Sequence, residues 1–217
     1  STHRWKTVAV PSHFESHEGV AFDGIGIYRK TIPRIALPEG CRALLHFQGA
    51  ATSVEVSFDG TRLGSHLGGW TPFRFDVTDL VRSQQTGRSH DVRVRVDEKV
   101  GHNSQGFLPI VCPHFGGIWQ GVQLLVVPNT WIDERRLLAA GDATTGKVRL
   151  ELPLKGQMLP SQSRVDVRVR LLGNRNWSRP SSFVAKPEID LVKSVVATDS
   201  NGDTQAGVIR LEVPVPD

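Results

Sequence analysis

The chain has 217 residues and a formal net charge of +4 at pH 7, with 26 Lys and Arg against 22 Asp and Glu. This length can bury one large core or two modest ones, and the mild basic excess lacks the clustered positive charge of a nucleic-acid-binding arm. Two cysteines are too few for a disulfide scaffold, and no apolar run approaches the roughly 20 residues of a membrane span. We therefore expect neither nucleic acid nor a membrane as a partner.

Short runs in which apolar and polar residues alternate fill the first 127 residues, and a period of two is typical of half-buried β-strands. No run shows the helical period that would indicate a long helix. In chain order, strands are predicted over residues 26–30, 43–47, 53–58, 73–77, 91–96 and 122–127. The outward positions of these strands include Arg93 and Arg95, which we expect on a solvated sheet face.

Turn residues separate these strands. Asp59-Gly60 predicts a tight hairpin, because glycine tolerates the positive φ that primed turns need. Gly68-Gly69 allows the backbone to bend or to pass close to another surface. Asp76 and Asp79 follow the strand at 73–77, where aspartate side chains bond nearby backbone groups and start turns or short helices.

Several of these motifs occur in the order found in one enzyme family. The stretch Gly26-Ile27-Tyr28-Arg29 is similar to an early Gly-x-Tyr-Arg strand, residues 45–50 to the strand that follows it, and residues 115–122 to a glycine-rich closing turn. Together with residues 58–80, they resemble the N-terminal sugar-binding domain of glycoside hydrolase family 2, the family of β-galactosidases, β-glucuronidases and β-mannosidases. The resemblance covers residues 5–127.

A second set of strands follows a boundary at residues 127–130. Pro128 cannot donate a hydrogen bond to a strand ladder, and all eight histidines of the chain lie before this boundary. Alternating apolar positions recur at residues 148–152, 165–171 and 209–213. The predicted fold class is all-β: a jelly-roll, galactose-binding-like sandwich over residues 1–128, then an immunoglobulin-like sandwich over residues 129–217. In the resembled family a catalytic (β/α)8 barrel comes next, so we expect this chain to be the front portion of a longer one.

The resemblance implies a retaining β-glycosidase, which needs two carboxyl groups about 5–5.5 Å apart. In that family both are barrel glutamates, and the acid/base follows an asparagine. Because this chain has no Asn-Glu dipeptide, we expect no catalytic residue in it. Its implied partners are a β-glycoside substrate and the C-terminal catalytic barrel of the same chain. We expect no organic cofactor and no metal-binding residue in this chain, and the metal requirement of the whole enzyme stays open. Two alternatives stay open: an autonomous carbohydrate-binding module and a structural or adhesion protein of tandem sandwiches.

The candidate sugar contacts fall in two places. Residues 97–117 form a long unpatterned segment, and loops of this length in compact domains are often functional. It supplies His102, Asn103 and His114 for hydroxyls and Phe107 for an apolar contact; an Ω-loop folded on its own sandwich is the alternative. Asp23 is a candidate by resemblance, because a loop residue five positions before the tyrosine reaches the sugar pocket in the β-galactosidases. An ordinary Asp-Gly turn is the alternative.

Trp70 and Trp119 are either stacking platforms for a sugar ring or core residues, and their place beside Gly-Gly pairs within strand patterns favours the core. His13 and His17 have the spacing of a helical metal pair, but no further ligand motif completes a site, which favours solvated loop histidines. Cys41 and Cys112 either stay free or form one bridge. The chain opens on a strand-like segment, which leaves open that a leader was removed or lies outside the given sequence. The location is open, with a periplasmic or secreted one favoured over a cytoplasmic one.

Overall fold

The computed structural model describes residues 5–19, 22–83, 89–99, 116–157, 164–168, 181–184 and 205–214. The chain forms two compact units, Ser1–Val127 and Pro128–Asp217, and each is described by itself. Every named strand pair is antiparallel, and the two helices in the described part are only four and six residues long. The all-β class predicted from the period-two runs is therefore confirmed. No helix among the described residues is long and apolar enough to cross a membrane.

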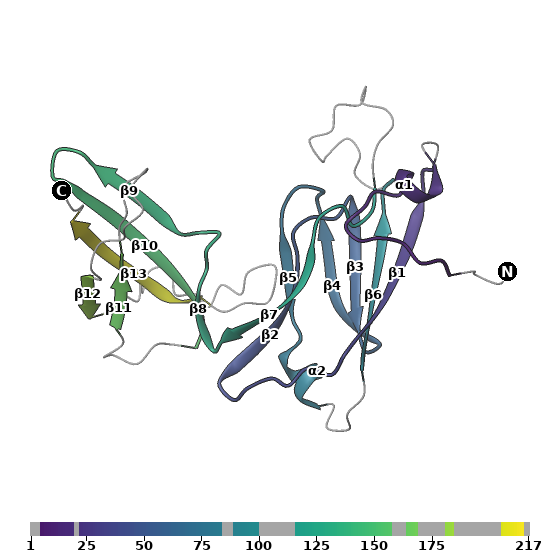
Figure 1. The fold of residues 1–217 in the computed structure, drawn as a ribbon, viewed down its shortest axis with the longest axis horizontal. Coiled ribbons are helices and arrows are strands. Elements are labelled where there is room, and N and C mark those ends of the chain that lie inside the picture. Colours follow the sequence, from purple (N-terminus) through teal and green to yellow (C-terminus); the bar gives the residue numbers. More distant parts are fainter. Residues whose placement is uncertain are drawn as a thin grey trace. The chain divides into compact units, whose positions relative to one another are not determined.

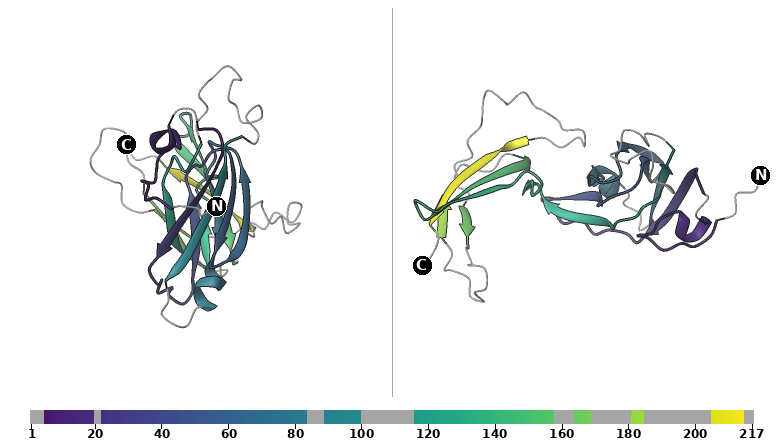
Figure 2. Two further views of the ribbon diagram at one scale, coloured as in Figure 1. Left: turned by 90° about the vertical axis from the view of Figure 1, so that its right-hand side faces the viewer. Right: turned by 90° about the horizontal axis from the view of Figure 1, so that it is seen from above.

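The first unit is a sandwich of two antiparallel sheets (Figure 1). One sheet has the order β1-β6-β3-β4 and the other β5-β2-β7. Helices α1 and α2 lie at opposite ends of the strands (Figures 1 and 2). The elements are α1 (Glu15–Glu18), β1 (Ile25–Ile32), β2 (Cys41–Phe47), β3 (Ser53–Phe58), β4 (Thr61–Leu67), β5 (Phe73–Asp76), α2 (Thr78–Ser83), β6 (His90–Asp97) and β7 (Val122–Pro128).

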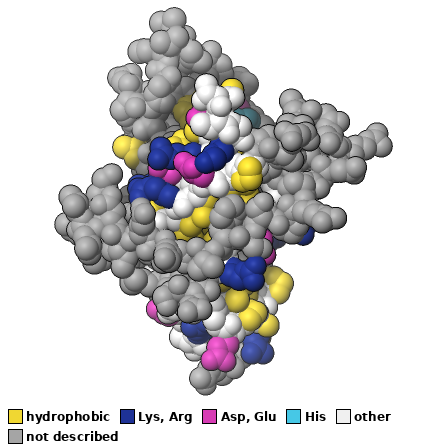
Figure 3. Space-filling view, turned by 90° about the vertical axis from the view of Figure 1, so that its left-hand side faces the viewer, with side chains coloured by type: hydrophobic (Ala, Val, Ile, Leu, Met, Phe, Trp, Pro, Cys, Tyr) yellow, Lys and Arg dark blue, Asp and Glu magenta, His cyan; other side chains and the backbone are white. Residues whose placement is uncertain are grey.

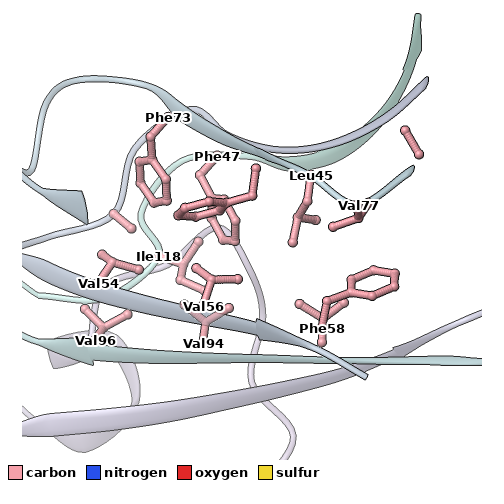
Figure 4. Packing of buried hydrophobic residues seen from close by; sticks show 14 of the residues in the cluster. Leu45, Phe47, Val54, Val56, Phe58, Phe73, Val77, Val94, Val96 and Ile118 are labelled. Atoms are coloured by element: carbon pink, nitrogen blue, oxygen red, sulfur yellow. The ribbon is translucent and has the colours of Figure 1, made fainter. Parts of the chain in front are cut away.

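The core of this unit is built from the inward residues of both sheets (Figure 4). Phe47 is fully buried, and its ring stacks on Phe73 with centroids 4.8 Å apart and an interplanar angle of 5°. The aliphatic side chains of β3 and β6 pack beneath these rings. The labelled members in Figure 4 are Leu45, Phe47, Val54, Val56, Phe58, Phe73, Val77, Val94, Val96 and Ile118.

The turn chemistry follows the sequence expectation. Asp59 and Gly60 have φ values of 50° and 81° and join β3 to β4, because both central residues of such a hairpin need positive φ. The Asp59 carboxylate also accepts hydrogen bonds at 2.8 Å from the Asp91 amide and at 2.7 Å from Nδ1 of buried His90. At the end of β5, Asp76 Oδ1 accepts the Thr78 amide at 2.8 Å, which starts α2.

One strand departs from the alternating pattern. Arg74, expected to face outward between Phe73 and Phe75, is only 2% exposed, and outward-facing Leu44 on neighbouring β2 is fully buried. This sheet is therefore shielded from water on both faces at these positions. On the other sheet Arg93 and Arg95 do lie on a solvated face, where they pair with Asp91 and Asp97 at 2.8 and 3.1 Å.

In the second unit β13, β10 and β8 form a sheet in that order, and β9 also pairs with β10; β11 and β12 form a separate pair. Its small core consists of residues from β10 and β13, with Val165 and Val167 of β11 packed against them. Ion pairs join Lys147 to Glu212 at 3.2 Å and Arg210 to Glu151 at 3.3 Å. Figure 3 shows a face of the molecule on which basic and acidic side chains lie next to one another. The elements are β8 (Thr130–Ile132), β9 (Leu138–Asp142), β10 (Lys147–Gly156), β11 (Arg164–Val167), β12 (Ser181–Val184) and β13 (Gln205–Pro214).

Candidate functional site

Strand register brings four chain segments to one end of the first sandwich, which we call the α1 end. Ile25 at the start of β1 and Ser53 at the start of β3 both pair with Asp97 at the end of β6, and Ser53 also pairs with Leu67 at the end of β4. The residues just before β1 and β3 and just after β4 and β6 therefore meet at this end, as Figure 1 shows. Rigid sandwiches commonly carry binding residues on such connections.

Asp23 lies at the α1 end, directly before β1, with its side chain 60% exposed. Its Oδ2 is 3.6 Å from Nζ of Lys99, which follows β6 and is also well exposed. Asp23 thus stands beside the first residues of the segment that joins β6 to β7. The other candidates on that segment, His102, Asn103, Phe107 and His114, lie outside the described residues.

Glu98 occupies the interior of the same end, although the sequence did not single it out. It is 1% exposed, its Oε1 accepts the Gly24 amide at 2.7 Å, and its own amide donates to the Gly24 carbonyl at 3.2 Å. Its Oε2 is buried and has no hydrogen-bond partner among the described residues. Burial raises the Glu98 pKa to about 7, outweighing the Gly24 hydrogen bond, which lowers it; nearby Glu15, Asp23 and Asp97 raise it further.

The glycine motifs of the sequence are explained by close packing at the α1 end. A Cβ on Gly116 would lie 2.3 Å from Glu98 Oε2, and a Cβ on Gly26 would lie 2.3 Å from Cε1 of Phe14. Gly117, with φ of 111°, passes the Tyr28 hydroxyl, which accepts the Ile118 amide at 3.4 Å. Burial raises the Tyr28 pKa to about 12, so this phenol stays neutral. The Gly-x-Tyr strand and the Gly-Gly-Ile turn therefore pack against each other.

Two tryptophans and a histidine form a second feature, which we call the tryptophan corner: Trp70, Trp119 and His13. The Trp119 Nε1 donates to the Gly69 carbonyl at 2.9 Å, the two indoles meet edge to face at 5.0 Å and 73°, and the His13 ring stacks on Trp119 at 6.3 Å. Trp70 is 53% exposed and Trp119 is half-buried. The core packing favoured from sequence is therefore wrong for Trp70, which meets Trp119 edge to face with about half of its own surface left exposed.

Among the described residues, no group of three or more His, Cys, Asp or Glu side chains is arranged to hold a metal ion. His17 lies in α1, and its Nδ1 is 3.0 Å from the His13 carbonyl oxygen. An exposed carboxylate can bond sugar hydroxyls and an exposed indole face can cover sugar C–H groups. Glu98 has a raised pKa that would suit a general acid, but its side chain is buried and bonded to the Gly24 amide.

The class of protein that these features define is an antiparallel β-sandwich with polar and aromatic groups at one end of the strands. No protein-family model matches the chain. It is 30% identical over 124 residues to a β-galactosidase of Thermoanaerobacter pseudethanolicus, and 32% identical over 111 residues to a β-glucuronidase of Bacteroides fragilis. These matches cover 57% and 50% of this chain but only 16% and 15% of the two relatives.

Solved structures extend the fold likeness to the whole chain. β-Glucuronidase 3 of Bacteroides uniformis superposes with a TM-score of 0.68 at 19% identity, covering 100% of this chain and 27% of that one. The β-glucuronidase of Parabacteroides merdae superposes with a TM-score of 0.65 at 19% identity, covering 97% and 26%. The likeness to the N-terminal part of family 2 glycosidases, predicted from the sequence motifs, is confirmed: the chain is similar to a part of β-galactosidase and β-glucuronidase enzymes.

Proposed function

We propose that this chain is the non-catalytic front portion of a retaining β-glycosidase, that it braces a catalytic barrel, and that the Asp23 turn forms part of the substrate-pocket wall. The observation that supports this most strongly is the match to two glycosidases of which the chain spans only 15–16%. The domains would be the sugar-binding jelly roll at residues 1–128 and the immunoglobulin-like sandwich at residues 129–217. His102, Asn103, His114 and Phe107 would line the pocket mouth with Asp23.

Chemistry by the chain alone is disfavoured by the placement of its carboxyl groups. A retaining mechanism needs one carboxyl that protonates the leaving oxygen and a second that attacks carbon. Glu98 has the raised pKa of an acid, but it is 1% exposed and lies behind Gly24. Asp23 is exposed, and its Oδ2 lies 3.6 Å from Nζ of exposed Lys99. These side chains fit a supporting role better than a catalytic one.

Asp23→Ala tests this role in the enzyme that carries the chain at its front. We expect kcat/KM for an aryl β-glycoside to fall about 10- to 100-fold, the effect of losing a charged hydrogen bond to a hydroxyl. The melting temperature should hardly change, because the exposed pair with Lys99 contributes little to stability. The matched control is Asp79→Ala, an exposed aspartate of α2 at the opposite end of the sandwich. Equal kinetics for both variants would remove Asp23 from the pocket.

A second function, carbohydrate binding by the chain itself, is favoured by the tryptophan corner. Its indoles present surfaces at nearly a right angle, with Trp70 half exposed. The Trp119 N–H is already bonded to the Gly69 carbonyl, so the corner offers ring faces for contact with sugar C–H groups. Polar atoms lie close by, since His66 Nε2 and Thr71 Oγ1 are 3.1 Å apart just before and after Trp70.

Trp70→Ala separates this second function from the first. We expect the 217-residue chain to bind β-linked oligosaccharides weakly in calorimetric titration and the variant to lose about tenfold in affinity, roughly 1.4 kcal/mol for one stacking surface. Trp5→Ala is the control, because Trp5 is 58% exposed and lies outside the corner. Absence of heat with gluco- and galacto-configured oligosaccharides, or an equal loss in both variants, would reject carbohydrate binding at this surface.

A further inference from the structure

The Glu98 carboxyl connects segments that are far apart in the sequence. Through Oε1 it holds the Gly24 amide at 2.7 Å, 74 residues away, and through Oε2 it sits against Gly116, where even a methyl group would clash. The Gly116 carbonyl in turn accepts the Phe14 amide at 2.9 Å, which leads directly into α1. The buried Glu98 side chain at the end of β6 therefore lies between the Asp23-Gly24 turn and Gly116, which precedes β7.

We propose that Glu98 is a positioning residue that fixes the Asp23-Gly24 turn at the α1 end and that it does so in its protonated form. The main-chain contacts reinforce the arrangement, since the Glu98 amide also bonds the Gly24 carbonyl and the Lys99 amide bonds Asp97 Oδ1 at 3.1 Å. A turn held at Gly24 by two hydrogen bonds to Glu98 presents the adjacent Asp23 side chain in one direction. The role of this turn in sugar binding rests on the proposed function. The positioning of the turn by Glu98 does not depend on it.

The charges around Glu98 disfavour its ionised form. The Arg95 guanidinium bonds Asp97 Oδ2 at 3.1 Å, and the Lys99 ammonium lies 3.6 Å from Asp23, so both described cations on this strand end are directed to other carboxylates. Glu18 of α1 is paired with Lys6 at 2.5 Å, while both carboxylate oxygens of Glu15 are buried without a described hydrogen-bond partner. Among the described residues, Glu15 of α1, Asp23 of the turn and Asp97 of its own strand act on Glu98, and Glu98 acts together with Glu15 and Glu18 on Tyr28 of β1. The cations Arg95 and Lys99 of this strand end pair with Asp97 and Asp23.

Loss of the proton would place a buried negative charge beside these acids. Such a charge is costly without a paired cation, and this burial cost outweighs the stronger bond that an ionised carboxylate accepts from the Gly24 amide. The carboxyl would therefore turn toward water and release the Gly24 amide. The Glu98 pKa of about 7 places this change near neutral pH. Below that pH the turn stays fixed, and above it Asp23 loses its support.

The test follows the Glu98 carboxyl and the Gly24 amide in the 217-residue chain by NMR. A carboxyl with a pKa of about 7 is about 90% protonated at pH 6 and about 10% protonated at pH 8. The protection of the Gly24 amide against hydrogen exchange, corrected for the intrinsic exchange rate, should therefore fall about tenfold from pH 6 to pH 8. Glu98→Gln keeps an oxygen acceptor without a titrating proton, and its Gly24 protection should stay level. Glu55→Gln, a change at an exposed glutamate of β3, should behave like the unaltered chain.

A Glu98 side-chain carbon that titrates near 4.5, the ordinary pKa, would overturn the proposal even if Glu98→Gln fails to fold. The proposal would also be overturned if the exchange protection of the Gly24 amide in the unaltered chain did not change from pH 6 to pH 8. An equal fall of this protection in Glu98→Gln would overturn it as well. These readouts need no substrate. If they hold while Asp23→Ala leaves the kinetics unchanged, the proposed pocket role fails and the positioning by Glu98 stands.

Discussion

Replacing Phe47 with alanine should destabilise the first unit by about 3–5 kcal/mol, the usual result of emptying a large aromatic site in a core. Phe47 has no exposed surface and stacks at 4.8 Å on Phe73, so the neighbouring rings lose contacts that water cannot replace. Urea unfolding, followed through the strand amides of the first unit, gives the free energy of unfolding. An effect of this size is a large part of the stability of an ordinary domain.

Two further variants keep this result interpretable. Ile27→Ala removes a side chain that is 59% exposed on β1, and should change the free energy of unfolding by less than about 0.5 kcal/mol. If Phe47→Ala does not fold, Phe47→Leu retains most of the volume and should show a smaller loss of about 1–2 kcal/mol. A Phe47→Ala loss no greater than that of Ile27→Ala would mean that the sandwich core is not packed around this ring.

The strands of the first unit were predictable because their local patterns and their burial agree. The alternation at residues 53–58 and 91–96 became β3 and β6, with Val54, Val56, Val94 and Val96 in the core. Asp59-Gly60 was equally readable, because a hairpin joins neighbouring strands and its turn chemistry is local. The order β1-β6-β3-β4 was not readable, since it depends on β6 pairing with both β1 and β3, strands that are distant from it in the sequence.

The candidate site was predictable only where a motif marked it. Asp23 was found by resemblance, and register then placed it beside Lys99. Glu98 carries no local signal, because an acidic pair after a strand normally lies in water; only the fold shows that Gly24, Gly116 and Phe14 enclose it. Trp70 illustrates the opposite error, since an indole beside two glycines within a strand pattern was expected in the core, whereas the fold leaves it 53% exposed.

The stability of the first unit should fall as the pH rises toward 8, and Glu98→Gln should remove that fall. The folded-state pKa of Glu98 is about 7, above the ordinary 4.5 that applies to the unfolded chain. Between these two values the folded state holds a proton that the unfolded state has lost, so unfolding releases a proton and becomes easier at higher pH. The stabilisation by the proton is fully present below about pH 4.5 and is lost as the pH passes through about 7.

The size of this effect follows from the same two pKa values. With about 1.4 kcal/mol for each tenfold change in proton affinity, the difference between 4.5 and about 7 corresponds to about 3 kcal/mol between pH 4.5 and pH 8. Other acids also titrate, and Asp91, whose pKa is lowered chiefly by its hydrogen bond from Arg29, acts in the opposite sense at lower pH. Subtracting the unfolding free energies of Glu98→Gln from those of the unaltered chain at each pH cancels these contributions. The difference should favour the variant progressively from pH 5 to pH 8, whereas a difference that stays constant over this range would show that Glu98 is ionised in the folded chain throughout.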